Sequence, residues 1–124
     1  MAKANKTAAV TVAVNLITTF TIAVQAQETW VAVATDGRRN FGYAVGMATR
    51  EAAEQTSLGE CVGDCSIRLA ALARCVAYAR SDPGNASGYA AGATLEAVRQ
   101  AAWEDCNRRV PSNSCVILAS RCFE

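Results

Sequence analysis

The sequence GYAVG at residues 42–46 returns as GYAAG at residues 88–92, and this repeated stretch decides the fold. Before it, WVAVAT at residues 30–35 matches CVAYAR at residues 75–80. Each glycine-framed stretch therefore follows an alternating apolar run, with one residue added in the second turn. Matches that keep this order along the chain indicate a tandem duplication.

Each half predicts the same local structure. The alternating run at residues 31–35 is typical of a strand with one buried face, and the glycine-framed stretch after the turn predicts the returning strand of a hairpin. Thr49 and Thr94 are suitable helix N-caps, because a glutamate two residues later favours the positive end of the helix dipole. A last strand opens at Cys65 and at Cys115. The predicted unit is ββαβ, used twice.

Two such units predict a single α+β domain at residues 27–124, made of repeats at about residues 30–75 and 75–122. Each unit supplies one helix to cover its strands. We therefore expect an antiparallel-rich sheet with both helices on one face and approximate twofold symmetry. The apolar stripe of the second helix ends at Cys106, which we expect to face the core.

Residues 1–26 are typical of a secretory signal peptide. Lys3 and Lys6 form a positive start, residues 7–24 are uncharged and mostly apolar, and Ala26 ends a site with small side chains. We expect cleavage before Gln27, although the apolar run is also long enough for an uncleaved membrane anchor. Cleavage predicts a bacterial protein that is periplasmic or secreted.

The composition is that of an ordinary globular domain, with 52% hydrophobic and 19% charged residues. The sequence has no histidine, which excludes imidazole bases and histidine metal ligands. Without Lys3 and Lys6, ten of the twelve basic groups remain against eleven acidic groups. This near-neutral balance predicts neither a nucleic acid partner nor membrane binding after cleavage, and nothing in the sequence addresses the oligomeric state.

Six cysteines in so short an exported chain predict disulfides, because an oxidising compartment lets thiols pair. We align three cysteines in each half, in the same order. The duplication then favours a local bridge in each half and a third bridge that joins the halves. The favoured pairs are Cys61–Cys65, Cys106–Cys115 and Cys75–Cys122.

Other uses of the cysteines remain open. The third cysteine of each half could instead pair with the first or second of its own half. A zinc site or a thioredoxin-like redox site is the remaining alternative, but the chain has no Cys-x-x-Cys spacing. We therefore expect no metal and no cofactor.

Several of these motifs also occur together in a known family. They are a strand ending in Ala-x-Ala, the Gly-Tyr-Ala-x-Gly hairpin, an alanine-rich helix ending in cysteine, and a strand opened by Asp64-Cys65 or Ser114-Cys115. The chain resembles the small secreted bacterial proteins grouped as domain of unknown function 4189. The resemblance covers most of residues 30–122. It implies an exported α+β domain with disulfides, and it implies no agreed reaction, cofactor or catalytic residue.

Four aromatic side chains form the candidate binding surface that the sequence offers. Tyr43 and Tyr89 occupy equivalent positions, and paired tyrosines supply large contact area at low entropic cost. Packing inside the fold is the competing interpretation, which the flanking glycines favour. Phe41 and Trp103 complete the candidate surface.

Charged residues offer two weaker candidates. Arg38-Arg39 and Arg108-Arg109 form basic pairs that suit a carboxylate or a phosphate, although solvated charge is the simpler interpretation. Catalysis by paired carboxylates requires acids from the two helices to converge in a cleft, which nothing in the sequence indicates. We expect no catalytic residue and no enzyme. The acids concerned are Glu51, Glu54, Glu104 and Asp105.

A small, cross-linked, exported domain without catalytic groups is typical of a binding module. We therefore expect an inhibitor or an immunity-type protein that acts on an envelope or extracellular partner. A structural or stress-resistant envelope component without a dedicated ligand is the alternative, and a carboxylate-based enzyme is the third. An exposed aromatic patch that contains any of these four residues would favour the binding module, and burial of all four would favour the structural component.

Overall fold

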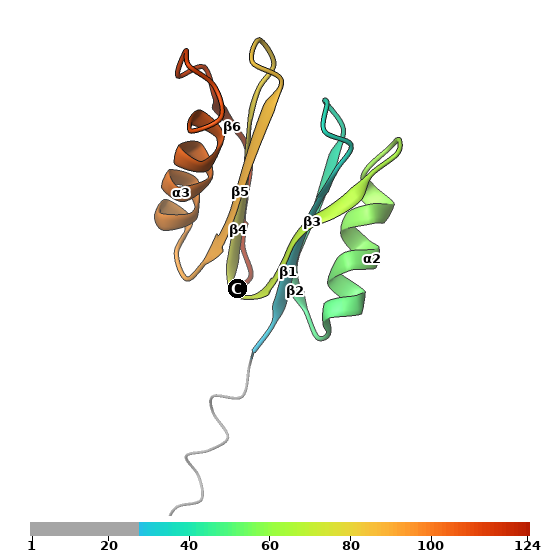
Figure 1. Cartoon of the computed structure of the whole chain (residues 1–124). Coiled ribbons are helices and arrows are strands. Elements are labelled where there is room, and N and C mark those ends of the chain that lie inside the picture. Colours follow the sequence, from blue (N-terminus) through green and yellow to red (C-terminus); the bar gives the residue numbers. More distant parts are fainter. Residues whose placement is uncertain (1–27) are drawn as a thin grey trace, which may run out of the picture.

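The computed structural model of the protein describes residues 28–124, and Figure 1 shows the whole chain. The predicted signal peptide at residues 1–26 lies outside the described residues. The first unit consists of β1 (Trp30–Thr35), β2 (Phe41–Met47), α2 (Arg50–Glu60) and β3 (Ser66–Leu72). The second consists of β4 (Cys75–Ser81), β5 (Ala86–Gly92), α3 (Leu95–Asn107) and β6 (Val116–Cys122). The α+β class and the two ββαβ units are confirmed.

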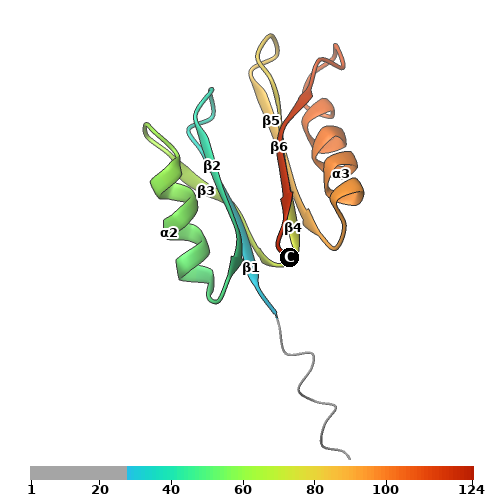
Figure 2. The same cartoon turned by 180° about the vertical axis from the view of Figure 1, so that it is seen from behind.

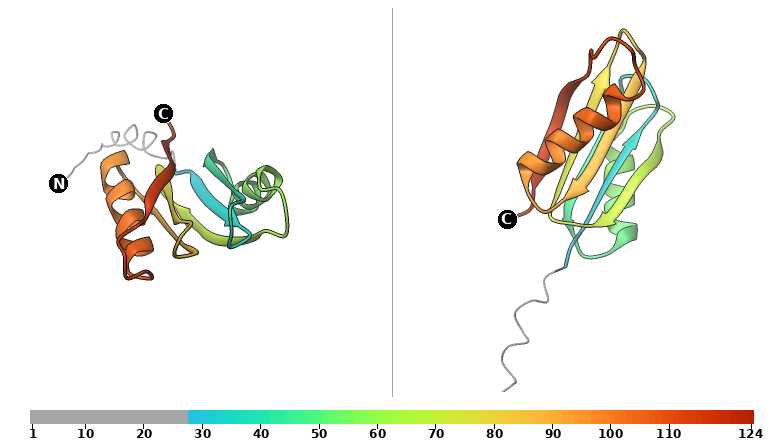
Figure 3. Two further views of the ribbon diagram at one scale, coloured as in Figure 1. Left: turned by 90° about the horizontal axis from the view of Figure 1, so that it is seen from above. Right: turned by 60° about the vertical axis from the view of Figure 1, so that its left-hand side comes forward.

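The strands form two separate sheets of three antiparallel strands each, in the orders β2-β1-β3 and β5-β4-β6. The sheets face each other, with α2 on the outer side of the first and α3 on the outer side of the second (Figures 1 and 2). The view from above in Figure 3 shows the resulting order of layers, helix, sheet, sheet and helix. The expected single sheet with both helices on one face is wrong.

The physical reason is that the central strands are buried on both faces. In β1, Val31 and Val33 face the other sheet, while Ala32 and Ala34 face the helix, and all four are fully buried. One helix covers only one of these faces. The second apolar face of each sheet therefore packs against its counterpart, because no other layer is present to remove it from water.

The layer between the sheets contains the largest fully buried side chain, Tyr78 of β4. Val33 of β1 is also fully buried in it, and the Phe41 ring stacks on Tyr78 with 4.6 Å between ring centroids. Each outer layer includes a partly buried tryptophan, but small residues lie where helix and strand approach most closely. A Cβ atom at Gly42 would overlap the Ser57 carbonyl oxygen of α2, so the glycine lets helix and strand approach closely.

Both helices begin as predicted. The Thr49 hydroxyl accepts a hydrogen bond from the Ala52 amide at 3.1 Å, and the Thr94 hydroxyl accepts one from the Ala97 amide at 3.2 Å. Cys106 of α3 is fully buried against its sheet, which confirms the expected orientation of that residue.

The three disulfides join the pairs that the duplication favours. They are Cys61–Cys65, Cys75–Cys122 and Cys106–Cys115. The expectation that the bridge from Cys75 joins the two halves is wrong, because Cys75 opens β4 and pairs with Cys122 of β6 in the same sheet. In the first sheet, Trp30 and Leu72 hold the same register position. The first unit therefore has two cysteines and the second has four, rather than three each.

Candidate functional site

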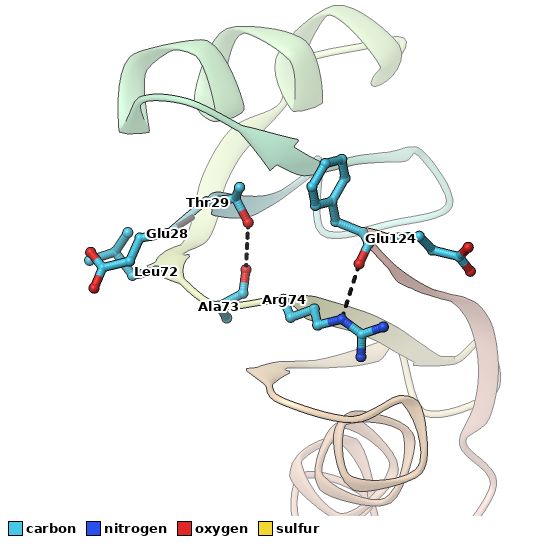
Figure 4. A pocket seen from close by; sticks show the side chains of 7 residues that line it. Glu28, Thr29, Leu72, Ala73, Arg74 and Glu124 are labelled. Atoms are coloured by element: carbon cyan, nitrogen blue, oxygen red, sulfur yellow. Dashed lines mark hydrogen bonds between the residues drawn. The ribbon is translucent and has the colours of Figure 1, made fainter. Parts of the chain in front are cut away.

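A hollow with a mainly apolar lining lies where the chain enters the first unit, crosses to the second and ends (Figure 4). We name it the chain-end groove. Its volume is about 470 Å3. Its lining residues are Glu28, Thr29, Leu72, Ala73, Arg74, Phe123 and Glu124.

Backbone hydrogen bonds fix the walls of the groove. The Ala73 amide donates to the Thr29 carbonyl at 3.1 Å, and the Phe123 amide donates to the Arg74 carbonyl at 2.9 Å. The crossing between β3 and β4, at Ala73 and Arg74, is thereby tied to the start of β1 and to the end of β6. The groove is therefore built on ordered backbone.

Two apolar side chains at the groove are open to solvent. Leu72 is 52% exposed, and Phe123 is 43% exposed. The Phe123 ring also lies against Gly46 of the first unit, where a Cβ atom would overlap the ring. Phe123 therefore closes part of the boundary between the units and presents its remaining surface to the groove.

Arg74 supplies the positive charge of the groove. Its Nε donates to the Phe123 carbonyl at 3.1 Å, and its Nη1 donates to the Ala93 carbonyl at 3.5 Å. Both acceptors are neutral, and Arg74 forms no ion pair with residues 28–124. The hydrogen bond to Phe123 holds the guanidinium beside the end of the chain. In Figure 4, the exposed side chains of Glu28 and Glu124 lie at separate sides of the groove. The groove thus combines an apolar floor with one oriented cation and a polar rim.

The four aromatic residues of the candidate surface do not come together. Phe41, Tyr43 and Tyr89 are partly buried and pack into the layer between the sheets. Trp103 lies on the other side of the second sheet, where its Nε1 donates to the Cys115 carbonyl at 3.1 Å. Each of Tyr43, Tyr89 and Trp103 borders a different hollow. All four are partly buried, so they form no exposed patch but are not fully buried either. They therefore do not decide between a binding module and a structural component.

The acids of the two helices are likewise far from one another, since α2 and α3 cover opposite outer faces (Figure 1). Glu54 accepts from Arg50 of its own helix at 3.0 Å, and Glu104 accepts from Gln100 at 2.7 Å. Asp105 accepts from both Arg108 and Arg109, and Glu51 is exposed. No acid of one helix shares a described cavity with an acid of the other. Within residues 28–124, no cluster of three or more cysteine, aspartate or glutamate side chains is placed to hold a metal ion.

Sequence reasoning missed Leu72, Arg74 and Phe123. A signal was present, because Leu72 and Cys122 end equivalent strands and the residues after them therefore meet at the same end of the two sheets. The exposure of these side chains depends on how the sheets pack together, which local patterns do not reveal.

Neither helix of the described residues is long and apolar enough to cross a membrane. Comparisons with curated proteins and with solved structures find no match. A family model matches residues 30–122, which include every strand and helix of both units and all six cysteines. The chain therefore belongs to the family described as Domain of unknown function (DUF4189).

Proposed function

We propose that this protein is an exported binding module that recognises an envelope or extracellular protein partner through the chain-end groove. The observation that carries the proposal is the exposure of Leu72 and Phe123 around a groove of about 470 Å3. Exposed apolar side chains gathered at a hollow with a polar rim are typical of protein-binding surfaces. An inhibitor or an immunity-type protein would use a surface of this kind.

The charges of the groove support a protein partner of defined chemistry. Arg74 is oriented by two carbonyl oxygens and has no carboxylate neighbour in an ion pair, so it is available to a partner's acidic side chain. An apolar side chain next to that acid would cover Leu72 and Phe123. The matching partner segment therefore carries one apolar and one acidic residue close together.

Rigidity also supports binding. The Cys75–Cys122 disulfide lies between the residues that border the groove, because Cys75 follows Arg74 and Cys122 precedes Phe123. A surface that is already ordered loses less conformational entropy when a partner binds. The bridge therefore favours affinity at this end of the molecule.

Export is part of the proposal, and the disulfides support it. All six cysteines are paired, and such bridges form and persist mainly in oxidising compartments. Together with the signal-like residues 1–26, this favours a periplasmic or secreted protein that begins at Gln27. The intact mass of protein recovered from its native host tests this point, and a chain that still begins at Met1 would contradict it.

We propose no catalytic role. The helix acids are exposed or bound to nearby residues of their own unit, and acid–base catalysis needs such groups to converge on a substrate. A binding role needs only a shaped and ordered surface. The arrangement of acids therefore supports the binding module over the carboxylate-based enzyme.

Leu72→Asp tests the proposal against Val62→Asp as a matched control. Val62 is 75% exposed and lies outside the groove, in the loop closed by Cys61–Cys65. Envelope and culture extracts are passed over the immobilised wild type and each immobilised variant, and retained proteins are quantified by mass spectrometry. We expect a protein that is retained by the wild type and by Val62→Asp. Leu72→Asp should retain it at least about tenfold less, because burying a carboxylate in an apolar contact is costly.

Folding is checked separately by the disulfide map and the thermal midpoint of each variant. The lack of any protein retained by the wild type would overturn the proposal and favour a structural envelope component. Equal retention by the two variants, whether kept or lost, would overturn the assignment of the partner to the groove.

A further inference from the structure

The hollow that Tyr89 borders is lined by residues of both units, from the ends of the strands next to the hairpin turns. These turns lie at the opposite end of the sheets from the chain end in Figure 1. We name this hollow the turn-end cleft. Its volume is about 250 Å3, which corresponds to about eight water molecules at their share of liquid volume. Residues of both units line it, among them Thr35, Arg68, Asn85, Ser87, Tyr89 and Arg109.

A buried arginine lies behind the wall of this cleft. Arg80 is only 5% exposed, and its Nε donates to an Asp82 carboxylate oxygen at 3.0 Å. Its Nη2 donates to Asn85 Oδ1 at 2.7 Å, and its Nη1 donates to Ser87 Oγ at 3.1 Å. Asn85 and Ser87 thus link the buried cation to the cleft surface.

These contacts also orient Asn85. Because its Oδ1 accepts from Arg80, its Nδ2 is left as a donor at the cleft, and no hydrogen bond within residues 28–124 uses it. An oxygen atom of a ligand is the natural acceptor for this donor. Proteins place such fixed donors where they recognise anions.

The charges around the cleft are unbalanced. Arg68 forms no ion pair with the described residues, and Arg108 and Arg109 share the single carboxylate of Asp105, at 2.6 Å and 3.1 Å. The lining residues of the cleft include two arginines, Arg68 and Arg109, and no carboxylate. An excess of positive charge in a hollow concentrates anions there.

We infer that the turn-end cleft binds a small molecule through an oxyanion, either a phosphate or a carboxylate group. Arg68 and Arg109 would meet the anion from opposite units, and the Asn85 Nδ2 would donate to it. The Tyr89 ring borders the same space and would contact the remainder of the ligand. This site is separate from the groove of the proposed function, so either proposal can fail without the other.

Titration of the disulfide-bonded protein with inorganic phosphate, and separately with succinate, tests the inference. We expect saturable shifts of backbone amide resonances at residues 84–89 and at Gly37, at ligand concentrations up to about 10 mM. Saturation by phosphate alone would assign a phosphate ligand, and saturation by succinate alone would assign a carboxylate. Saturation by both would assign an oxyanion site that accepts either group.

Arg68→Gln provides the matched variant, because Arg68 is exposed and unpaired in the described residues, so its loss leaves the fold intact. We expect it to weaken binding about tenfold, since a charge-assisted hydrogen bond is lost. Arg99→Gln, on the outer surface of α3, should leave binding unchanged. The inference is overturned if neither anion saturates, or if Arg68→Gln binds as well as the wild type.

Discussion

The two units share one topology but close their sheets differently. At the open end of the second sheet, Cys75 and Cys122 face each other and form a disulfide, whereas Trp30 and Leu72 hold this register position in the first sheet. The Trp30 ring lies under the guanidinium of Arg50, 5.8 Å from the ring centroid. The same position of the repeated unit is therefore occupied by a disulfide in the second sheet and by two apolar residues in the first.

The inner faces of the sheets also differ. Val33 of the first unit corresponds to Tyr78 of the second, whose hydroxyl lies 2.9 Å from Ser87 Oγ and 3.4 Å from Thr35 Oγ. The helix-facing sides keep small residues in both units, including Gly42 and Gly88. Close helix contact therefore constrains the repeat more strongly than the layer between the sheets does.

The largest expected effect comes from truncating the bigger member of the inner pair. Tyr78→Ala should lower the free energy of unfolding by about 4 kcal/mol or more, because it leaves a cavity and removes the hydroxyl partner of Ser87. Val33→Ala, at the equivalent position, should cost about half as much because it removes less apolar volume. Urea denaturation of both variants measures the difference, and equal losses would show that the two inner faces contribute alike.

The closure of each sheet is the next comparison. Replacing Cys75 and Cys122 by alanine should cost about 4 kcal/mol, because this bridge closes a loop with a sequence separation of 47. The same model gives about 2.5 kcal/mol for Cys106–Cys115 and about 2 kcal/mol for Cys61–Cys65, whose separations are 9 and 4.

The matched change in the first sheet is Leu72→Ala, which should cost only about 1 kcal/mol because Leu72 is half exposed. Thermal and urea unfolding of the oxidised proteins measure all four values. If the losses of unfolding free energy for the three disulfides do not follow loop length, strain in the folded state or residual structure in the unfolded state outweighs loop entropy.

A smaller effect separates two equivalent glycines. Gly46 has a φ of +70° and lies against the Phe123 ring, whereas the equivalent Gly92 would place a Cβ atom 3.2 Å from Val98 Cγ1 and has no positive φ. Gly46→Ala should therefore cost about 1 to 2 kcal/mol from backbone strain alone. Gly92→Ala should cost less than Gly46→Ala. If the two variants unfold at the same urea concentration, the positive φ of Gly46 does not make its substitution more destabilising than that of Gly92.

The smallest expected effect concerns the turns of the two hairpins, at residues 36–40 and 81–85. A hydrogen bond from the Asn40 side chain lowers the pKa of Asp36 below its ordinary value of 3.8, and backbone amides of Arg38 and Asn40 lower it further. Because the folded pKa is the lower one, this turn is favoured above pH 3.8 and loses that support as the pH falls through the folded pKa.

The equivalent residue of the second turn is Ser81, whose hydroxyl accepts from the Gly84 amide and does not titrate in this range. Amide exchange between pH 2 and about pH 6 should therefore show extra opening at Arg38 and Asn40 on acidification, but not at Gly84. Asp36→Asn should abolish the difference. Parallel behaviour of the two turns would contradict the assigned role of Asp36.

Sequence reasoning reached the fold class, both ββαβ units, the helix caps and the three bridges, because the duplication gave each local pattern a second copy. It failed where placement depends on contacts between units. WVAVAT and CVAYAR were interpreted as strands with one buried face, yet neither run keeps a polar face for water, and both faces are buried. That lack of regular polar alternation was the signal for a second layer.

The candidate site was harder to predict for the same reason. Leu72 and Phe123 follow ordinary strand patterns, and their exposure results from the way the two sheets meet. At the turn-end cleft, Arg80 is a charged residue in a central strand whose other residues are mostly apolar. Its meaning depends on Asn85 and Ser87, which become its partners only when the hairpin closes.

The bridges have one more consequence, because each begins and ends inside a single unit. Within residues 28–124, the units are joined covalently only by the short crossing at Ala73 and Arg74. The protein is therefore suited to fragment complementation: two separately produced chains, divided at this crossing, would each retain complete cross-links and would reassemble through the apolar layer between their sheets.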